Sequence, residues 1–180
     1  MPEPAGGVDG AALSRHYHGP DMRYILLDRI ERFHQSHRLI AIKTVSRSED
    51  FFTDHFPGQP VMPGALLVEC MAQAGTALLE LSQDLRVKAL LTMVDRAKFK
   101  TPVRPGDTLS VDVTLQSADG AWARVDGVIR VQNRVVADAM LTFSIHAAAP
   151  FYPAAIHDMV KLTYDDMLRD AVIGPISDTP

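Results

Sequence analysis

The sequence predicts an α+β domain in which an antiparallel β-sheet wraps around one long central helix. Residues 64–81 are apolar on every side, which is typical of a helix that is buried all round. Residues 90–145 form a succession of strand patterns separated by turn residues at 105–107 and 119–120. After Pro153, apolar residues recur at helical spacing, so we expect an extra C-terminal helix.

The composition is that of one globular domain and excludes several classes of protein. The chain has 180 residues, of which 47% are hydrophobic and 22% charged. Its net charge of -4 argues against a nucleic-acid binder, which would carry a basic surface. The single cysteine, Cys70, excludes an intramolecular disulfide. We see neither a secretory leader nor a run that approaches a membrane span, and therefore expect a cytoplasmic protein.

The chain divides into three parts. Residues 1–21 are rich in proline and glycine and predict a flexible N-terminal arm. Residues 22–146 hold the strands and the apolar helix, and we expect them to form the main domain. Residues 147–180 form a C-terminal extension with an amphipathic helix, which would pack onto the domain or onto a partner chain.

The individual elements follow from alternation and from turn residues. Residues 39–45 are rich in β-branched side chains and predict a strand, whereas 26–33 mix charged and apolar residues without a clear period. Prolines and glycine mark 51–63 as a loop, and Pro63 suits the first turn of a helix because it lacks an N–H. Later strand patterns occupy 90–94, 97–101, 109–115, 122–131 and 135–145.

Glu69 is a candidate catalytic acid because it interrupts an otherwise apolar helix. A buried carboxylate must be paired, protonated or functional, and burial favours the protonated form that a general acid needs. Gln73 lies one helical turn later and faces the same way, so it can hydrogen-bond to Glu69. The alternative is a structural glutamate bonded to the backbone or to an arginine, and the helix pattern alone does not choose between them.

His55 is a candidate base in the loop that precedes this helix. A lone loop histidine is usually just a polar residue at the surface. Here the prolines and glycine around it stiffen the loop, which suits presentation of a catalytic side chain. The helix start at Gly64 leaves free backbone N–H groups and a positive dipole end, which can polarise a carbonyl. A base and an acid delivered to one apolar place would serve proton abstraction and return.

These residues form a motif that resembles a known family. His-Phe-Pro-Gly-Gln-Pro-Val-Met-Pro-Gly at 55–64, followed by Glu69 and by Ala-Gln-Ala at 72–74, is similar to the FabZ-type (3R)-hydroxyacyl-[acyl-carrier-protein] dehydratases. Arg-Tyr with Leu-Leu-Asp-Arg within 23–29 resembles the family's N-terminal entry, and 95–107 resembles its second signature. The likeness covers roughly two-thirds of the chain.

The resemblance implies a hot-dog fold and dimers that build each site from both chains, often assembled into trimers of dimers. It implies that His55 takes the α-proton of a 3-hydroxyacyl thioester, that Glu69 lets the hydroxyl leave as water, and that the Gly64 N–H polarises the thioester carbonyl. Gln73 would support Glu69. The resemblance implies no metal and no organic cofactor. The acyl group would arrive on the 4′-phosphopantetheine arm of acyl carrier protein.

Two features depart from the family pattern. Asp54 stands where the family usually has glycine, and its charge would favour the protonated imidazole of His55 and weaken it as a base. The alternative is a solvated loop aspartate with negligible effect, because exposed charges are well screened. The second departure is the extension at 147–180, which ordinary members lack and which would shape the acyl tunnel or alter assembly.

Basic residues after the helix are candidates for binding the acidic carrier protein. Arg96, Lys98 and Lys100 occupy alternate positions, so we expect them on one face of a strand. Arg104 is a similar candidate next to a turn. The alternative is that the charged side chains protect an edge strand against aggregation.

Two other functions remain open from the sequence. A hot-dog thioesterase would cleave the thioester with a carboxylate that activates water, and a non-catalytic partner subunit would complete a heteromeric dehydratase. His34 and His37 have a spacing that a metal could use, but no acidic or thiol partner follows, so we expect no metal site. Neither acyl chain length nor the pathway can be inferred from the residues.

Overall fold

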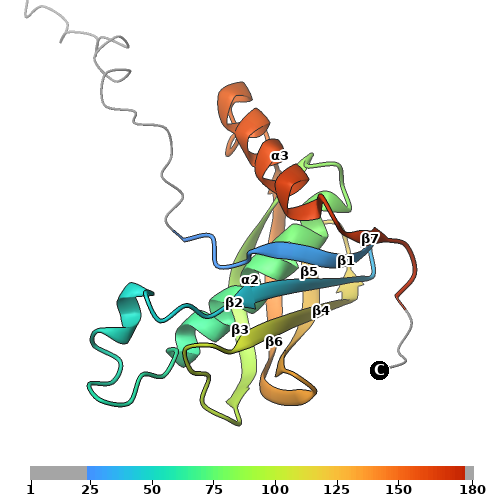
Figure 1. Cartoon of the computed structure of the whole chain (residues 1–180). Helices are drawn as coiled ribbons and strands as arrows, with labels where there is room; N and C mark the ends of the chain where they lie inside the picture. The colour runs from blue at the N-terminus through green and yellow to red at the C-terminus, as the bar shows by residue number, and fades with distance from the viewer. Residues whose placement is uncertain (1–23, 177–180) are drawn as a thin grey trace, which may run out of the picture.

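A computed structural model of the chain describes residues 24–176, and the predicted arm at 1–21 lies outside the described residues. A seven-stranded sheet curls around the helix α2, in the strand order β3-β6-β5-β4-β2-β1-β7 (Figure 1). The elements in chain order are β1 (Arg29–His34), β2 (Arg38–Thr44), the 3-10 helix η1 (Asp50–Phe52), α2 (Gly64–Leu81), β3 (Val87–Phe99), β4 (Thr108–Ala118), β5 (Trp122–Val131), β6 (Arg134–Ala147), α3 (Ala154–Leu168) and β7 (Val172–Ile173).

Neighbouring strands of the sheet pair antiparallel, except that the two-residue β7 pairs parallel with β1. The predicted turn at 119–120 is confirmed as the connection between β4 and β5. Gly120 has φ of 89°, and the Asp119 carboxylate accepts hydrogen bonds from the N–H groups of Ala121 and Trp122 at 3.0 and 2.8 Å. Both residues therefore favour this hairpin turn: the aspartate side chain bonds to the backbone, and glycine tolerates the positive φ.

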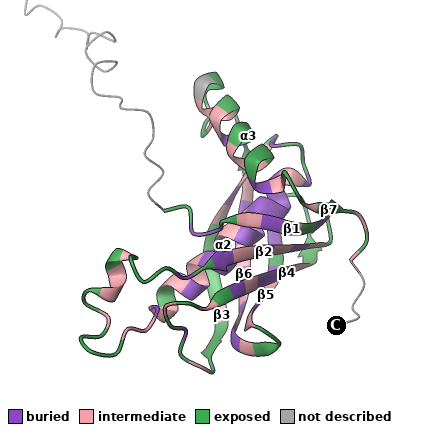
Figure 2. Cartoon of the chain, in the orientation of Figure 1, coloured by how far each residue is buried: buried purple, intermediate pink, exposed green. Residues whose placement is uncertain are grey.

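The core lies between α2 and the concave face of the sheet. Buried residues of both surfaces form one cluster there. The purple segments of Figure 2 mark the buried residues along α2 and the strands. The two surfaces approach closely at two glycines. A Cβ on Gly75 would lie 2.8 Å from the Phe143 ring, and a Cβ on Gly127 would lie 2.8 Å from the Met71 sulfur. The helix can sit this deep in the curl because neither position carries a side chain.

Two expectations about α2 are wrong. The helix is not buried all round, because Ala65 is exposed and Glu69, Gln73 and Thr76 are only half-buried. The sheet covers one side of the helix, and these residues lie on the other. The expectation that no run approaches a membrane span is also wrong. By length and composition α2 is the one helix within residues 24–176 that could cross a membrane, yet it is the core helix of this domain.

The strand after α2 is longer and less regular than the sequence suggests. Residues predicted as two short segments form the single strand β3, and its pairing with β6 shifts between Asp95 and Lys98. Arg96 sits in this irregularity with φ of 51°. The expected common face for Arg96, Lys98 and Lys100 is therefore wrong, because a bulge changes the direction in which successive side chains point and Lys100 follows the end of β3.

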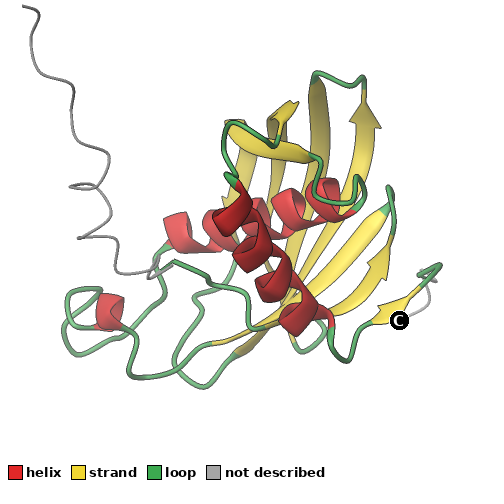
Figure 3. Cartoon of the chain, turned by 90° about the horizontal axis from the view of Figure 1, so that it is seen from above, coloured by secondary structure: helices red, strands yellow, loops and turns green. Residues whose placement is uncertain are grey.

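The predicted C-terminal helix is confirmed as α3, which crosses the side of α2 that the sheet leaves open (Figure 3). β1 was not predicted. Its register shifts between Ile30 and Arg32, so the two-residue alternation that reveals a strand is interrupted in a segment of only six residues.

Substituting Gly75→Ala is expected to destabilise the protein by about 1–3 kcal/mol, because the added methyl group would displace the buried Phe143 ring. Helix propensity alone predicts the opposite sign, a gain of about 1 kcal/mol. Urea unfolding of both proteins measures the difference. A more stable variant would show that the helix and sheet have room to separate.

Candidate active site

Val61 holds His55 from two directions. The Val61 N–H donates to the His55 carbonyl at 3.0 Å, and His55 Nδ1 lies 3.1 Å from the Val61 carbonyl oxygen. Because a carbonyl can only accept, Nδ1 must carry the proton of this bond. In the neutral ring, Nε2 then keeps a free lone pair and is available to accept a proton. The backbone thus sets the tautomer that a general base needs.

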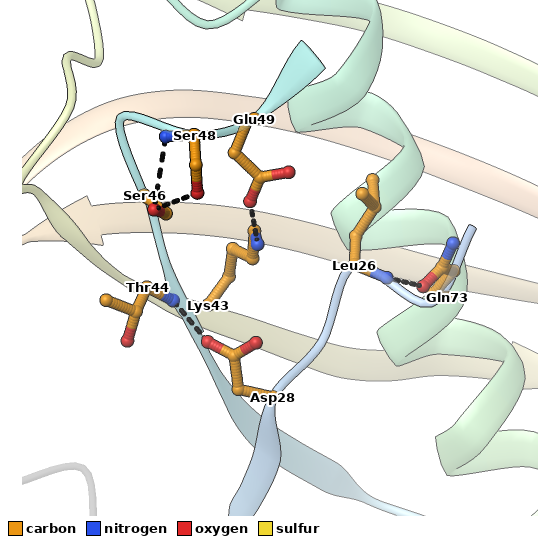
Figure 4. Close-up of polar contacts among 8 residues, drawn as sticks. All are labelled: Leu26, Asp28, Lys43, Thr44, Ser46, Ser48, Glu49 and Gln73. Atoms are coloured by element: carbon orange, nitrogen blue, oxygen red, sulfur yellow. Dashed lines mark hydrogen bonds and ion pairs between the residues drawn. The ribbon is translucent and has the colours of Figure 1, made fainter. Parts of the chain in front are cut away.

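Contacts at its start and around the histidine position the loop that carries His55. At its start, Glu49 forms an ion pair with Lys43 of β2, whose side chain is buried (Figure 4). Around His55, the ring of Phe56 stacks on the imidazole at 4.0 Å between centroids, and Gly58 takes φ of 78° in the following turn. The histidine is half-buried, and Asp54 beside it is exposed, as expected for a solvated loop aspartate.

The N-terminus of α2 follows this loop directly. Pro63 precedes Gly64, and no side chain caps the helix in the part of the chain described. Its first backbone N–H groups therefore point outward with the positive end of the helix dipole. A Cβ on Gly64 would lie 3.0 Å from the ring of Phe99. The start of the helix therefore packs closely against β3, and glycine leaves room for this contact.

Gln73 fixes the orientation of Glu69. Its Nε2 donates to Glu69 Oε1 at 2.9 Å and to the Tyr24 carbonyl at 2.6 Å, while its Oε1 accepts the Leu26 N–H at 2.9 Å. Figure 4 shows the bond to Leu26. The predicted pair of Glu69 and Gln73 is therefore formed, and Gln73 also ties the segment before β1 to the helix. Within residues 24–176, the second carboxylate oxygen of Glu69 accepts no hydrogen bond and faces the cavity.

A cavity of about 610 Å³ lies between α2, β3 and α3. Glu69, Gln73 and Thr76 supply its polar wall on α2, and the rest of the lining is mainly apolar side chains. Their spacing of four and three residues places them on one face of the helix. His55 is not among the lining residues. A single chain thus brings Glu69 and Gln73 together in a cavity but does not bring His55 into it.

The fully buried carboxylate of α2 is Glu80, which sequence reasoning missed. Its side chain is 0% exposed and is held by Lys88 Nζ at 3.0 Å, by the Ala89 N–H at 3.2 Å, and by the hydroxyls of Tyr152 and Tyr164 at 3.2 and 3.3 Å. Glu69 was expected to be the buried carboxylate, but it opens to the cavity. The same signal, a glutamate in an apolar helix, marks both residues.

Burial and the Glu80 charge control the ionisation of its neighbours. Burial lowers the pKa of Lys88, but the Glu80 carboxylate and the Tyr152 hydrogen bond outweigh this effect and leave the pKa raised. Burial, together with Glu80, raises the pKa of Tyr164 well above its ordinary value. Elsewhere in the core, burial raises the pKa of the Cys70 thiol to about 12. That thiol is therefore a packing group rather than a nucleophile.

The basic candidates occupy different surroundings. Arg96 and Lys98 are exposed on β3, and Arg104 is exposed beside the turn that precedes β4. Lys100 forms an ion pair of 2.6 Å with Asp138, so its charge is partly neutralised. His34 and His37 contact each other edge to face at 4.8 Å, and the described residues contain no cluster of three metal-binding side chains.

Comparison with known proteins places this chain in a family. A family model of the FabA-like domain matches residues 19–140. The chain belongs to the FabA-like family. Within this family, the chain is similar to the 3-hydroxyacyl-[acyl-carrier-protein] dehydratase FabZ of Anaeromyxobacter dehalogenans, with 43% identity over 120 residues. The aligned residues cover 64% of this chain and 77% of that relative. The chain is therefore a FabZ-type member.

Solved structures confirm the hot-dog fold of this FabA-like domain. The dehydratase heterocomplex ApeI:P from Xenorhabdus doucetiae matches with a TM-score of 0.55 at 16% identity, covering 77% of this chain and 89% of that one. Thioesterase HI1161 from Haemophilus influenzae matches with a TM-score of 0.53 at 18% identity, covering 66% and 78%. Since both kinds of enzyme share the fold, the fold alone does not decide the reaction.

Substituting Tyr164→Phe is expected to lower the free energy of unfolding at pH 7 by about 1.5–3 kcal/mol, because it removes a hydrogen bond to a buried carboxylate. In the unsubstituted protein, the pKa values of Tyr164 and Lys88 are raised, so folding favours the protonated form of both groups. The stability that this contributes is fully present below about pH 10, where both groups are protonated in the unfolded chain too, and it is lost as the pH rises further.

Urea unfolding between pH 7 and 11 measures both effects. The Phe variant should lose less stability above pH 10 than the unsubstituted protein, and Tyr24→Phe, at an exposed tyrosine, serves as the control. Parallel pH profiles for the Tyr164 variant and the unsubstituted protein would contradict this assignment.

Proposed function

We propose that this chain removes water from (3R)-3-hydroxyacyl groups carried on the 4′-phosphopantetheine arm of acyl carrier protein and forms the trans-2-enoyl thioester. The observation that carries the proposal is Glu69, a hydrogen-bonded carboxylate in the wall of an apolar cavity. His55, with Nε2 free to accept a proton, supports it. Family membership supports the same reaction, since the relatives are 3-hydroxyacyl-carrier-protein dehydratases.

In the proposed reaction, each of three groups has one role. His55 Nε2 takes the proton from the carbon next to the thioester, while the Gly64 N–H stabilises the negative charge that develops on the carbonyl oxygen. The electron pair of that C–H bond forms the new carbon–carbon double bond as the C3–O bond breaks. Glu69 gives its proton to the departing hydroxyl, which leaves as water. The protein groups only transfer protons and donate hydrogen bonds, and no electron leaves or enters the substrate, so the proposal uses neither a metal nor an organic cofactor.

A second copy of the chain completes the site in this proposal. His55 lies outside the cavity that Glu69 lines, so a complete site needs a His55 from elsewhere. A symmetric dimer would supply it, with the His55 loop of one chain facing the Glu69 of its partner. We further propose that such dimers assemble into trimers of dimers. Residues 22–146 would form the catalytic domain of a cytoplasmic enzyme, to which 147–180 are an addition.

Exposed basic side chains would guide the acidic carrier to the site. Arg96, Lys98 and Arg104 are exposed, and a positive surface steers an acidic partner. Lys100 contributes less in this proposal because Asp138 already neutralises it.

Substituting His55→Gln or Glu69→Gln is expected to lower kcat by about 10²–10⁴-fold, because each removes a proton-transfer group. Mass spectrometry of a series of (3R)-hydroxyacyl carrier proteins follows the loss of one water from the intact thioester. His37→Gln and Glu31→Gln, outside the site, are the matched controls. Release of free carrier thiol by the unsubstituted protein would identify a thioesterase, and no change on any substrate would favour a subunit that needs a partner.

Mixing the two inactive variants tests the shared site. If each site takes His55 from one chain and Glu69 from the other, random exchange should restore roughly a quarter of the original activity, since about half the dimers then hold one intact site. Recovery of no activity, with subunit exchange verified by native mass spectrometry, would show that both groups act within one chain.

Substituting Arg96→Glu together with Lys98→Glu is expected to lower kcat/KM for the carrier-bound substrate by about tenfold at low salt, with less effect at high salt. Activity on the same acyl group attached to free pantetheine should not change, because that substrate lacks the acidic protein. Asp126→Lys, on β5, is the charge-change control. An equal loss on both substrates would mean that these residues act on the fold or the site.

A further inference from the structure

We propose that α3 closes the end of the acyl-binding cavity and limits the length of the acyl chain that this protein accepts. This inference rests on the proposed function, because it takes the cavity beside Glu69 as the acyl site. The family match ends at residue 140, whereas α3 spans Ala154–Leu168. The wall is therefore a feature of this chain beyond the matched domain.

One face of α3 forms the wall. Its cavity-lining residues recur at helical spacing: Ile156, Met159, Val160, Thr163, Tyr164 and Met167. The opposite face is open to solvent, where Leu162 is 68% exposed. An aliphatic chain fits this lining because it is mainly apolar, and the volume of about 610 Å³ is in the range of small-molecule sites.

The length of the cavity follows from α2. Glu69 marks the reacting end, and Ala77 is the last α2 residue in the lining. At about 1.5 Å per residue, the two lie roughly 12 Å apart along the helix. An extended chain advances by about 1.2 Å per bond, so roughly ten carbons fit between the reacting atoms and the far end.

The Glu80 cluster makes the far end rigid. Tyr152 and Tyr164, from the extension, donate to the buried Glu80 carboxylate, which also pairs with Lys88. Lys88 and both tyrosines line the cavity. A longer acyl chain would have to displace these donors and leave a buried charge without its partners, which is strongly unfavourable. Glu80 therefore anchors α3 and keeps the wall in place.

Two substitutions at Met159 test the limit in opposite directions. Met159→Ala enlarges the cavity. The ratio of kcat/KM for chains longer than the original optimum to kcat/KM for the optimal chain is expected to rise by about tenfold or more. Met159→Trp fills the cavity and should move the optimum to shorter chains. Leu162→Ala and Leu162→Trp repeat both changes on the exposed face of α3 and should leave the profile unchanged.

The readout is the chain-length profile of water loss, together with the Kd of saturated acyl-pantetheine thioesters, which bind without reacting. The proposal that α3 limits chain length is overturned if both Met159 variants, shown to be folded by thermal unfolding, keep the original profile and the original Kd series. Water loss that persists on the short substrates would then leave the proposed function standing. If no substrate loses water but the Kd series still shifts, the dehydratase proposal fails and the α3 wall stands.

Discussion

The close approach of α2 to the sheet is the constraint on which the rest of this structure depends. Gly75 and Gly127 remove the side chains that would separate the two surfaces, and Phe143 and Met71 fill the space instead. Because the sheet curls around only one side of the helix, the other side stays open. Every polar side chain of α2 that can act on a ligand lies along that open side, so the packing that builds the core also creates the cavity.

Two glutamates on this helix show how position decides the role of one residue type. Glu69 and Glu80 are eleven residues apart, which at about 100° per residue returns to nearly the same face. Glu80 is enclosed and receives bonds from four donors, so it serves to hold the C-terminal extension. Glu69 accepts a hydrogen bond from Gln73, its one side-chain partner within residues 24–176, and faces the cavity, which leaves it free for proton transfer.

Much of the fold could be predicted because its signals are local. The bounds of α2 follow from Pro63 and the apolar run, and the hairpin between β4 and β5 follows from Asp119 and Gly120. Elements with interrupted patterns could not be predicted. β1 loses its alternation at a register shift, and the bulge in β3 separates Arg96 from the face expected for it, because bulges depend on pairing with a neighbouring strand.

The candidate site divides in the same way. The sequence by itself determined the motif from His55 to Glu69, the pairing of Glu69 with Gln73, and the helix in the extension, since each depends on residues close in the chain. Only the tertiary structure decided that Glu80 anchors that helix through Tyr152 and Tyr164, more than seventy positions away. It also decided that His55 stays outside the Glu69 cavity. Burial and enclosure are set by segments distant in the chain, and a pattern along the chain carries no measure of either.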